Sequence, residues 1–165
     1  MRMEALNVAA SLVLPDWCLA AGFVRNLIWD HLHGYQERTP LNDIDLIYFN
    51  KDQDGKKIDL IYEETLKLRL NLPWSVKNQA RMHVRNDDQP YLSSEDAMSY
   101  WVEVETAIGA TLSDGKVQLV APFGVEVLML KSISINHKRV KRDAFQERIT
   151  SKEWLKIWPD LTVIE

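Results

Sequence analysis

The sequence lacks the features that would place it in several common classes of protein. It holds one cysteine, Cys18, so neither a disulfide framework nor a cysteine-based zinc site is available. No apolar run reaches the roughly 20 residues that a membrane-spanning helix needs. With 20 Lys and Arg against 24 Asp and Glu, the net charge of −4 gives no overall attraction for nucleic acid. Because Glu4 and Asn7 interrupt the first apolar stretch, we expect no signal peptide and a cytoplasmic location.

The size and composition favour one packed globular unit. A chain of 165 residues is long enough to bury a single core, and 46% of its residues, six tryptophans among them, are hydrophobic. No internal repeat, linker or low-complexity segment divides it. We therefore expect a single domain over residues 1–165, with a C-terminal extension from about residue 121.

Periodicity along the chain predicts helices and strands in alternation, which indicates an α/β (α+β) fold class. The expected elements are an N-terminal helix ended by Pro15, a strand over 17–21, a helix over 24–32, a strand from 43, an exposed turn over 50–55, a helix over 58–70, a strand over 74–79, a helix from about 94 to 106, a hairpin over 111–120 and a short closing helix that ends at Trp158. The helix over 24–32 should bury Val24, Leu27, Ile28 and Leu32. The basic segment 137–148 is either a solvated face or a contact for triphosphate or nucleic acid.

Two carboxylates lie one residue apart at the start of an apolar run, in Asn42-Asp43-Ile44-Asp45. Side chains on a strand alternate between faces, so Asp43 and Asp45 should share a face. Two such anions raise each other's pKa unless a cation sits between them. Oxygen ligands that leave room for substrate phosphate are the usual arrangement for Mg²⁺. The pattern predicts a site for Mg²⁺ or Mn²⁺ at Asp43 and Asp45; a solvated strand start is the alternative.

A second feature precedes this pair, where Ala20-Ala21-Gly22 leads from a strand into a helix. A helix N-terminus presents free N–H groups and partial positive charge, which suit phosphate. Gly22 allows close approach of the backbone, and the following amide of Phe23 lies in the same turn. The side chains of Arg25 and Asn26 can add donors. The sequence thus predicts a phosphate site beside the carboxylate pair, although Arg25 alone is equally consistent with an ordinary surface residue.

A small-residue turn before a helix, followed by an acid-x-acid strand, resembles the DNA polymerase β-like nucleotidyltransferase superfamily. Longer blocks resemble one bacterial family of stand-alone nucleotidyltransferase-like proteins: LPDWCLAAGFVRNLIWDHLHG, PLNDIDLIYFN, WSVKNQARMH, LVAPFGVEVLML and KEWLKIWPDL. They lie across residues 14–161. The resemblance implies a mixed twisted sheet flanked by helices. It also implies Mg²⁺-dependent transfer of a nucleoside monophosphate from an NTP to a hydroxyl of an unknown acceptor, which is a small molecule, a protein or RNA.

One departure from the superfamily pattern concerns a third acid, which usually lies on a neighbouring strand. By order that strand is 74–79, and its outward positions are Ser75, Lys77 and Gln79, none of which is acidic. The polar exit of the same strand suggests that Asn78 and Arg81 contact the nucleotide. A catalytically inactive nucleotide-binding or interaction module is therefore the alternative to an enzyme, and the oligomeric state is open.

Overall fold

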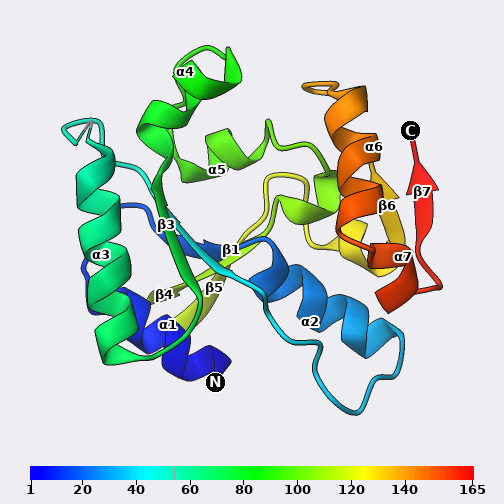
Figure 1. Cartoon of the computed structure of the whole chain (residues 1–165), viewed down its shortest axis with the longest axis horizontal. Coiled ribbons are helices and arrows are strands. Elements are labelled where there is room, and N and C mark those ends of the chain that lie inside the picture. Colours follow the sequence, from blue (N-terminus) through cyan, green and yellow to red (C-terminus); the bar gives the residue numbers. More distant parts are fainter. Residues whose placement is uncertain (54) are drawn as a thin grey trace.

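A computed structural model describes residues 1–53 and 55–165, and Figure 1 shows the arrangement of its elements. Asp54, within the turn expected over 50–55, lies outside the described residues. The elements in chain order are α1 (Arg2–Ala10), β1 (Cys18–Ala20), α2 (Gly22–Leu32), β2 (Ile44–Tyr48), α3 (Lys56–Arg69), β3 (Trp74–Asn78), η1 (Gln79–Arg81), α4 (Met82–Asn86), α5 (Ser94–Met98), η2 (Val104–Thr106), β4 (Gly109–Ser113), β5 (Lys116–Val120), η3 (Glu126–Leu130), β6 (Ser132–Ser134), α6 (Arg142–Ser151), α7 (Trp154–Ile157) and β7 (Thr162–Ile164).

The main sheet has five strands in the order β3-β2-β1-β4-β5. β2 pairs in parallel with β3, while β1 is antiparallel to both β2 and β4, and β4 forms the predicted hairpin with β5. This is the mixed sheet that the family resemblance implies. A second, two-stranded sheet joins β6 to β7 near the C-terminus.

The two faces of the main sheet have different roles. Ile44, Leu46 and Tyr48 of β2 belong to a hydrophobic core cluster that also holds residues of α1 and α3, so this face of the sheet is buried. Figure 1 shows α1 and α3 together at one side of the sheet, and the two helices contact each other. The intervening residues, Asp45 and Ile47, point to the opposite face, as period-two alternation requires.

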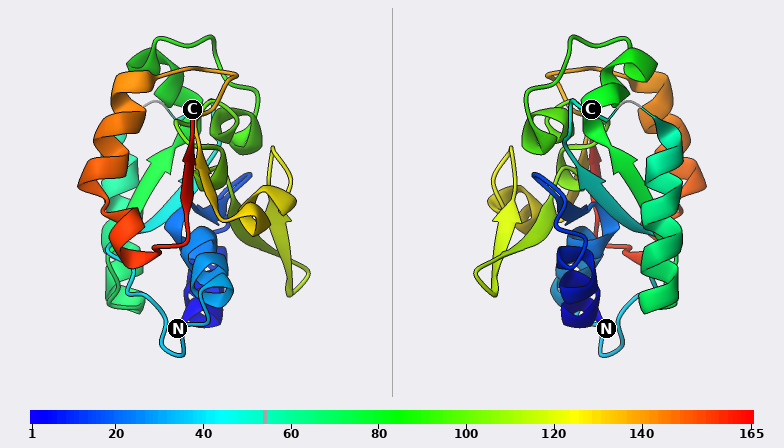
Figure 2. Two further views of the ribbon diagram at one scale, coloured as in Figure 1. Left: turned by 90° about the vertical axis from the view of Figure 1, so that its right-hand side faces the viewer. Right: turned by 90° about the vertical axis from the view of Figure 1, so that its left-hand side faces the viewer.

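The C-terminal part packs on α2. Trp29 of α2 is fully buried in a cluster with Trp154 and Trp158, which come from α7 and its end, and with residues of β6 and α6. The ring of Trp29 meets those of Trp154 and Trp158 edge to face. In the side views of Figure 2, α6, α7 and β7 lie alongside the rest of the molecule and do not extend away from it.

The structure corrects two of the predicted helices. The helix expected over 94–106 ends at Met98. The side-chain amide of Asn136 donates hydrogen bonds to the carbonyls of Ser99 and Trp101, and its backbone N–H donates to the carbonyl of Val102. These carbonyls are therefore bonded to another part of the chain and not to a following helical turn. In α2, Phe23, Val24, Arg25, Asn26, Trp29 and Asp30 are the buried residues. Leu27, Ile28 and Leu32 are only half-buried, since the C-terminal part covers a different side of the helix from the one predicted.

Within the described residues, every helix is too short or too polar to cross a membrane.

Candidate active site

A cavity of about 520 Å³ lies on the face of the main sheet that carries Asp45. One wall is formed by the N-terminus of α2 and the loop 39–43, and the floor by outward-facing residues of β2 and β3. The opposite wall comes from residues 100–106 together with α6 and α7. The volume is in the range of cavities that hold nucleotide-sized ligands.

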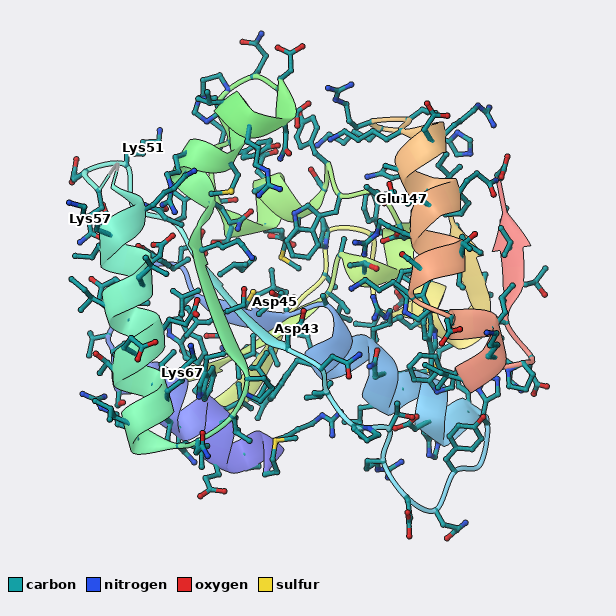
Figure 3. The ribbon with its side chains drawn as sticks, viewed as in Figure 1. Asp43, Asp45, Lys51, Lys57, Lys67 and Glu147 are labelled. Atoms are coloured by element: carbon teal, nitrogen blue, oxygen red, sulfur yellow. The ribbon has the colours of Figure 1, made fainter. Side chains whose placement is uncertain are left out.

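Asp43 and Asp45 both line this cavity. Asp43 is exposed and Asp45 half-buried, and Figure 3 shows the two carboxylates side by side near the centre of the molecule. Burial raises the pKa of Asp45, and the negative charge of Asp43 raises it further, whereas Lys77 and the hydroxyl of Ser75 act in the opposite direction. The pair thus has the unbalanced negative charge that a bound cation would neutralise.

The donor set at this place suits a divalent ion that also binds substrate. Among residues 1–53 and 55–165, no group of three or more His, Cys, Asp and Glu side chains is arranged to hold a metal. Asp43 and Asp45 are two carboxylates that would hold such an ion, with substrate phosphate and water in the rest of the coordination sphere. Mg²⁺ is commonly held by one or two carboxylates in this way.

The raised pKa of Asp45 has a consequence for stability in the metal-free protein. The folded state favours the protonated carboxyl, so the stability that it contributes is complete below the unfolded pKa of about 3.9 and is lost as the pH rises through the higher folded value. We expect Asp45→Asn, which is always neutral, to raise the free energy of unfolding at pH 7 and to have little effect at pH 3. Urea unfolding in EDTA measures the free energy of unfolding at pH 7 and at pH 3. A lower stability of the variant than of the wild-type protein at pH 7 would contradict the expectation.

The turn before α2 is strained at Ala21. This residue has φ 55° and ψ −120°, a region in which residues other than glycine are rare, and it is the N-cap of α2. Its N–H donates to the carbonyl of Ile108, and its own carbonyl accepts from the N–H groups of Val24 and Arg25. The first two amides of the helix, Gly22 and Phe23, have no intrahelical acceptor and remain for a ligand. The unusual backbone is therefore at Ala21, one residue before the predicted Gly22.

Replacing Ala21 by glycine tests this strain. We expect Ala21→Gly to raise the free energy of unfolding by about 1 kcal/mol, because glycine adopts this φ without steric conflict. The same substitution inside α1, Ala5→Gly, should lower it by a similar amount. Both are measured by urea unfolding. Equal destabilisation by the two substitutions would show that Ala21 is unstrained.

Arg25 is buried in the wall of the cavity. Its Nη1 donates to Thr106 Oγ1 at 2.8 Å and its Nη2 to Asn26 Oδ1 at 3.0 Å. The guanidinium also lies over the rings of Trp29 and Trp154, at 5.0 and 4.7 Å from their centroids. Burial lowers the pKa of Arg25 to about 10, with Glu103 acting against this change. Arg25 is therefore no ordinary surface residue but a fixed, charged donor at the cavity, with Asn26 beside it.

Positive charge prevails around the cavity. Its lining includes six cationic side chains, from Arg25, Lys77, Arg85, Lys141, Arg148 and Lys152, against the three carboxylates of Asp43, Asp45 and Glu103. The basic segment 137–148 divides accordingly: Lys141 and Arg148 line the cavity, whereas Arg139 and Arg142 pair with Asp88 and Glu165. An acidic protein thus presents a local cationic surface suited to a polyphosphate.

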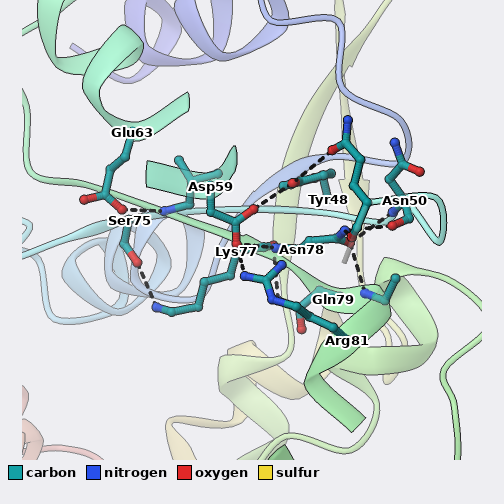
Figure 4. Close-up of polar contacts among 12 residues, drawn as sticks. Tyr48, Asn50, Asp59, Glu63, Ser75, Lys77, Asn78, Gln79 and Arg81 are labelled. Atoms are coloured by element: carbon teal, nitrogen blue, oxygen red, sulfur yellow. Dashed lines mark hydrogen bonds and ion pairs between the residues drawn. The ribbon is translucent and has the colours of Figure 1, made fainter. Parts of the chain in front are cut away.

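Three of the predicted nucleotide-binding residues lie outside the cavity. The ring of Phe23 is in the core, so only its amide is at the turn. Asn78 is fully buried and bonds to Asn50 and to the carbonyl of Gln53. Arg81 pairs with Asp59 (Figure 4). Asn78 and Arg81 therefore hold the loop after β2 and the exit of β3, and their positions give no support to a nucleotide contact.

Asp30 joins the two walls. Fully buried in α2, it accepts hydrogen bonds from the backbone N–H and the hydroxyl of Thr39, at 2.8 and 2.6 Å, and from Trp158 Nε1 at 2.9 Å. Thr39 begins the loop that leads to Asp43, and Trp158 follows α7. The loop and the C-terminal wall are thus attached to the same side chain.

Several lining residues could not be found from the sequence. Glu103 is buried and pairs with Arg148, and Thr106 and Trp154 contact Arg25. These residues are 78 or more positions from Arg25 in the chain, and no local pattern marks them. The only sequence signal was the position of the basic segment beside the tryptophan-rich end.

Comparison with known proteins identifies the family and supports the fold. Residues 7–163 match the profile of a family described as "Nucleotidyltransferase". An NMR structure in which a CCA-adding enzyme head domain was recognised has a TM-score of 0.85 and 30% identity, and the match covers 99% of this chain and 88% of the other. Two apo forms of a tRNA-processing enzyme share the fold. One has a TM-score of 0.57 and 14% identity, and the match covers 99% of this chain and 42% of that one. The other has a TM-score of 0.56 and 15% identity, and the match covers 98% of this chain and 44% of that one. No curated protein sequence matches the chain. The profile match spans nearly the whole length, and the chain therefore belongs to this nucleotidyltransferase family and has the fold of a nucleotidyltransferase head domain.

Proposed function

We propose that the chain is a Mg²⁺- or Mn²⁺-dependent enzyme that transfers a nucleoside monophosphate from an NTP to a hydroxyl of an acceptor. The observation that carries the proposal is the position of Asp43 and Asp45 in one cavity with the N-terminus of α2 and Arg25. Metal ligands and phosphate donors that face the same space are what phosphoryl transfer requires, because the reaction depends mainly on positioning and charge.

In this reaction the hydroxyl oxygen of the acceptor attacks the α-phosphorus of the NTP. The new P–O bond forms as the bond from the α-phosphorus to the bridging oxygen of the β-phosphate breaks, and pyrophosphate leaves. Gly22 and Phe23 would donate their amides to the phosphates, with Arg25 and Asn26 as side-chain donors. A divalent ion, when bound at Asp43 and Asp45, supplies charge that stabilises the phosphates in the transition state.

The proton of the attacking hydroxyl finds no general base on the strands beside Asp45. Ala20 and Ser75 flank Asp45 on β1 and β3, and neither can act as a general base near neutral pH. The proton would go to water or to a basic group of the acceptor. A general base is worth roughly 10²–10⁴-fold, so we expect slow transfer without one, not its absence.

The acceptor remains a small molecule, a protein or RNA. The cations of the cavity favour an acceptor that is itself anionic, and the name of the tRNA-processing enzyme among the structural relatives adds tRNA to the candidates. We also propose that residues 1–165 act as one domain, since the extension from about residue 121 supplies a wall of the cavity through Arg148 and Trp154.

A labelled-NTP assay tests the proposal. The protein is incubated with each of the four α-labelled NTPs and Mg²⁺, with tRNA or with a small-molecule extract as acceptor, and label transfer and pyrophosphate release are measured. We expect pyrophosphate release that depends on Mg²⁺ and on one class of acceptor. If no NTP binds or turns over under any condition, the proposed activity is wrong.

A second function is favoured by one observation. Because no carboxylate flanks Asp45 on either neighbouring strand, the chain would also serve as a nucleotide-binding module without catalysis. NTP binding in the presence of Mg²⁺, without turnover for any acceptor in the same assay, would identify this case.

A further inference from the structure

The surroundings of Asp45 on the cavity face are set by strand pairing. Its neighbours across the sheet are Ala20 on β1 and Ser75 on β3, and β3 is the edge strand of the sheet. The next residue of β3 that points to this face is Lys77, beside Ile47 of β2. The sheet therefore places a lysine, and no third carboxylate, next to the pair formed by Asp43 and Asp45.

The side chain of Lys77 is directed back along β3. Its Nζ donates to Ser75 Oγ at 2.9 Å, the hydroxyl of the residue that is paired with Asp45 (Figure 4). Lys77 lines the cavity, and within residues 1–53 and 55–165 no carboxylate oxygen lies within 4.0 Å of it. By contrast, Arg148 in the opposite wall is neutralised by Glu103. The ammonium of Lys77 thus makes no direct ion pair in the described residues, and it lies near enough to Asp45 to lower the pKa of that carboxyl.

We propose that Lys77 takes the place of a second divalent cation, so that the site binds a single Mg²⁺ or Mn²⁺ ion at Asp43 and Asp45. This inference rests on the proposed function. Two-metal sites hold their ions about 3.5–4 Å apart and need enough carboxylates to offset both. Here a second ion would have to share the carboxylates of Asp43 and Asp45 with the first, without a third acid on the neighbouring strands, and it would be repelled by the ammonium. Lys77 instead provides one fixed positive charge toward the substrate phosphates.

The number of bound ions tests this role without any measurement of turnover. Mn²⁺ is titrated into the whole protein with a non-hydrolysable α,β-methylene analogue of each NTP, and electron paramagnetic resonance counts the bound ions per ternary complex. Two ions a few ångströms apart also give a spin-coupled spectrum, which one ion cannot. We expect one Mn²⁺ per complex and no coupling in the wild-type protein.

Variants of β3 separate the effect of the lysine from that of the missing acid. Lys77 is exposed on an edge strand, so its replacement should leave the fold intact. We expect Lys77→Gln to tighten binding of the single ion by about tenfold through loss of repulsion. The double variant Ser75→Asp with Lys77→Gln should bind two ions with a coupled spectrum. Lys57→Gln, on the exposed side of α3, is the matched control and should change nothing.

Each other outcome has a definite meaning. Two coupled ions in the wild-type protein would overturn the single-ion inference and leave the proposed transferase function in place. An unchanged affinity in Lys77→Gln would show that the lysine does not govern occupancy. If no Mn²⁺ binds beyond that held by the free analogue, and Asp45→Asn makes no difference, the metal site of the proposed function fails as well.

Discussion

Replacing Asp43 or Asp45 by asparagine is expected to abolish measurable nucleotidyl transfer while the protein remains folded. Each substitution removes a carboxylate from the cavity, and the ion that it would hold is worth several kcal/mol of transition-state stabilisation. At about 1.4 kcal/mol per factor of ten, the loss should be on the order of a thousandfold. Pyrophosphate release at fixed Mg²⁺ measures the rate, and Mn²⁺-induced broadening of NMR signals near residues 43–45 and Gly22 reports the binding of the ion.

The control for this pair is Asp52→Asn. Asp52 is exposed in the loop after β2 and does not line the cavity, so its loss should leave both the rate and the broadening as they are. Urea unfolding verifies that all three variants are folded. Full activity in either Asp43→Asn or Asp45→Asn would place the catalytic metal elsewhere, and an equal loss in Asp52→Asn would point to a general effect of charge.

Gly22→Val is expected to weaken NTP binding by roughly a hundredfold, or about 2.7 kcal/mol. A Cβ at Gly22 would lie 3.4 Å from the side-chain amide of Asn26 and 3.5 Å from Arg25 Nη2, which are ordinary contacts, so the chain should still fold. The larger valine side chain, however, would occupy the space between these donors and the free amides of α2. Arg25→Ala should weaken binding less, by about 1.5 kcal/mol, because it removes one charge-assisted contact.

Gly55→Val is the matched glycine control. Gly55 precedes α3 in an extended conformation with nothing within 4 Å of its Cβ position, and it does not line the cavity. Calorimetric titration with each NTP and Mg²⁺ gives the affinities. If Gly22→Val binds as tightly as Gly55→Val, the phosphates lie away from the N-terminus of α2.

Local patterns were sufficient to predict most strands of the sheet, and the family resemblance added that the sheet is mixed. Alternation predicted that Asp43 and Asp45 share a face, and both line the cavity, although Asp43 lies just before β2. The superfamily resemblance, with the order of elements, predicted the strand with Ser75 beside them, as the pairing of Ser75 with Asp45 confirms. The hairpin also follows from a Ser113-Asp114-Gly115 turn, in which Asp114 and Gly115 have positive φ. These features depend on residues close together in sequence or on a two-residue period, and both can be seen without a structure.

The rest of the site depends on contacts that no local pattern encodes. Arg25 was predicted as a phosphate donor, but its burial against Trp154 follows from the docking of residues 100–106 and 141–158 on α2. Asn78 was predicted to contact the nucleotide because it lies in a polar strand exit, yet its side chain donates hydrogen bonds to the carbonyls of Asn50 and Gln53 in the loop after β2. The helix expected to reach 106 is ended by Asn136, 37 residues from the Ser99 carbonyl that it binds. In each case a tertiary contact overrides the local preference.

The hydrogen bonds of Asp30 and Arg25 also bear on when the cavity forms during folding. The bond from Arg25 to Thr106 spans 81 residues, and that from Trp158 to Asp30 spans 128, whereas β2 and β3 are separated by one helix. The entropy lost in closing such long loops has to be offset by contacts already made, so nearby strands pair before distant segments dock. On a growing chain the residues around Asp43 emerge before the segment that holds Trp158. The cavity is thus complete only after the segment with Trp158 has docked on α2, and a ligand enclosed by both walls can bind only from then on.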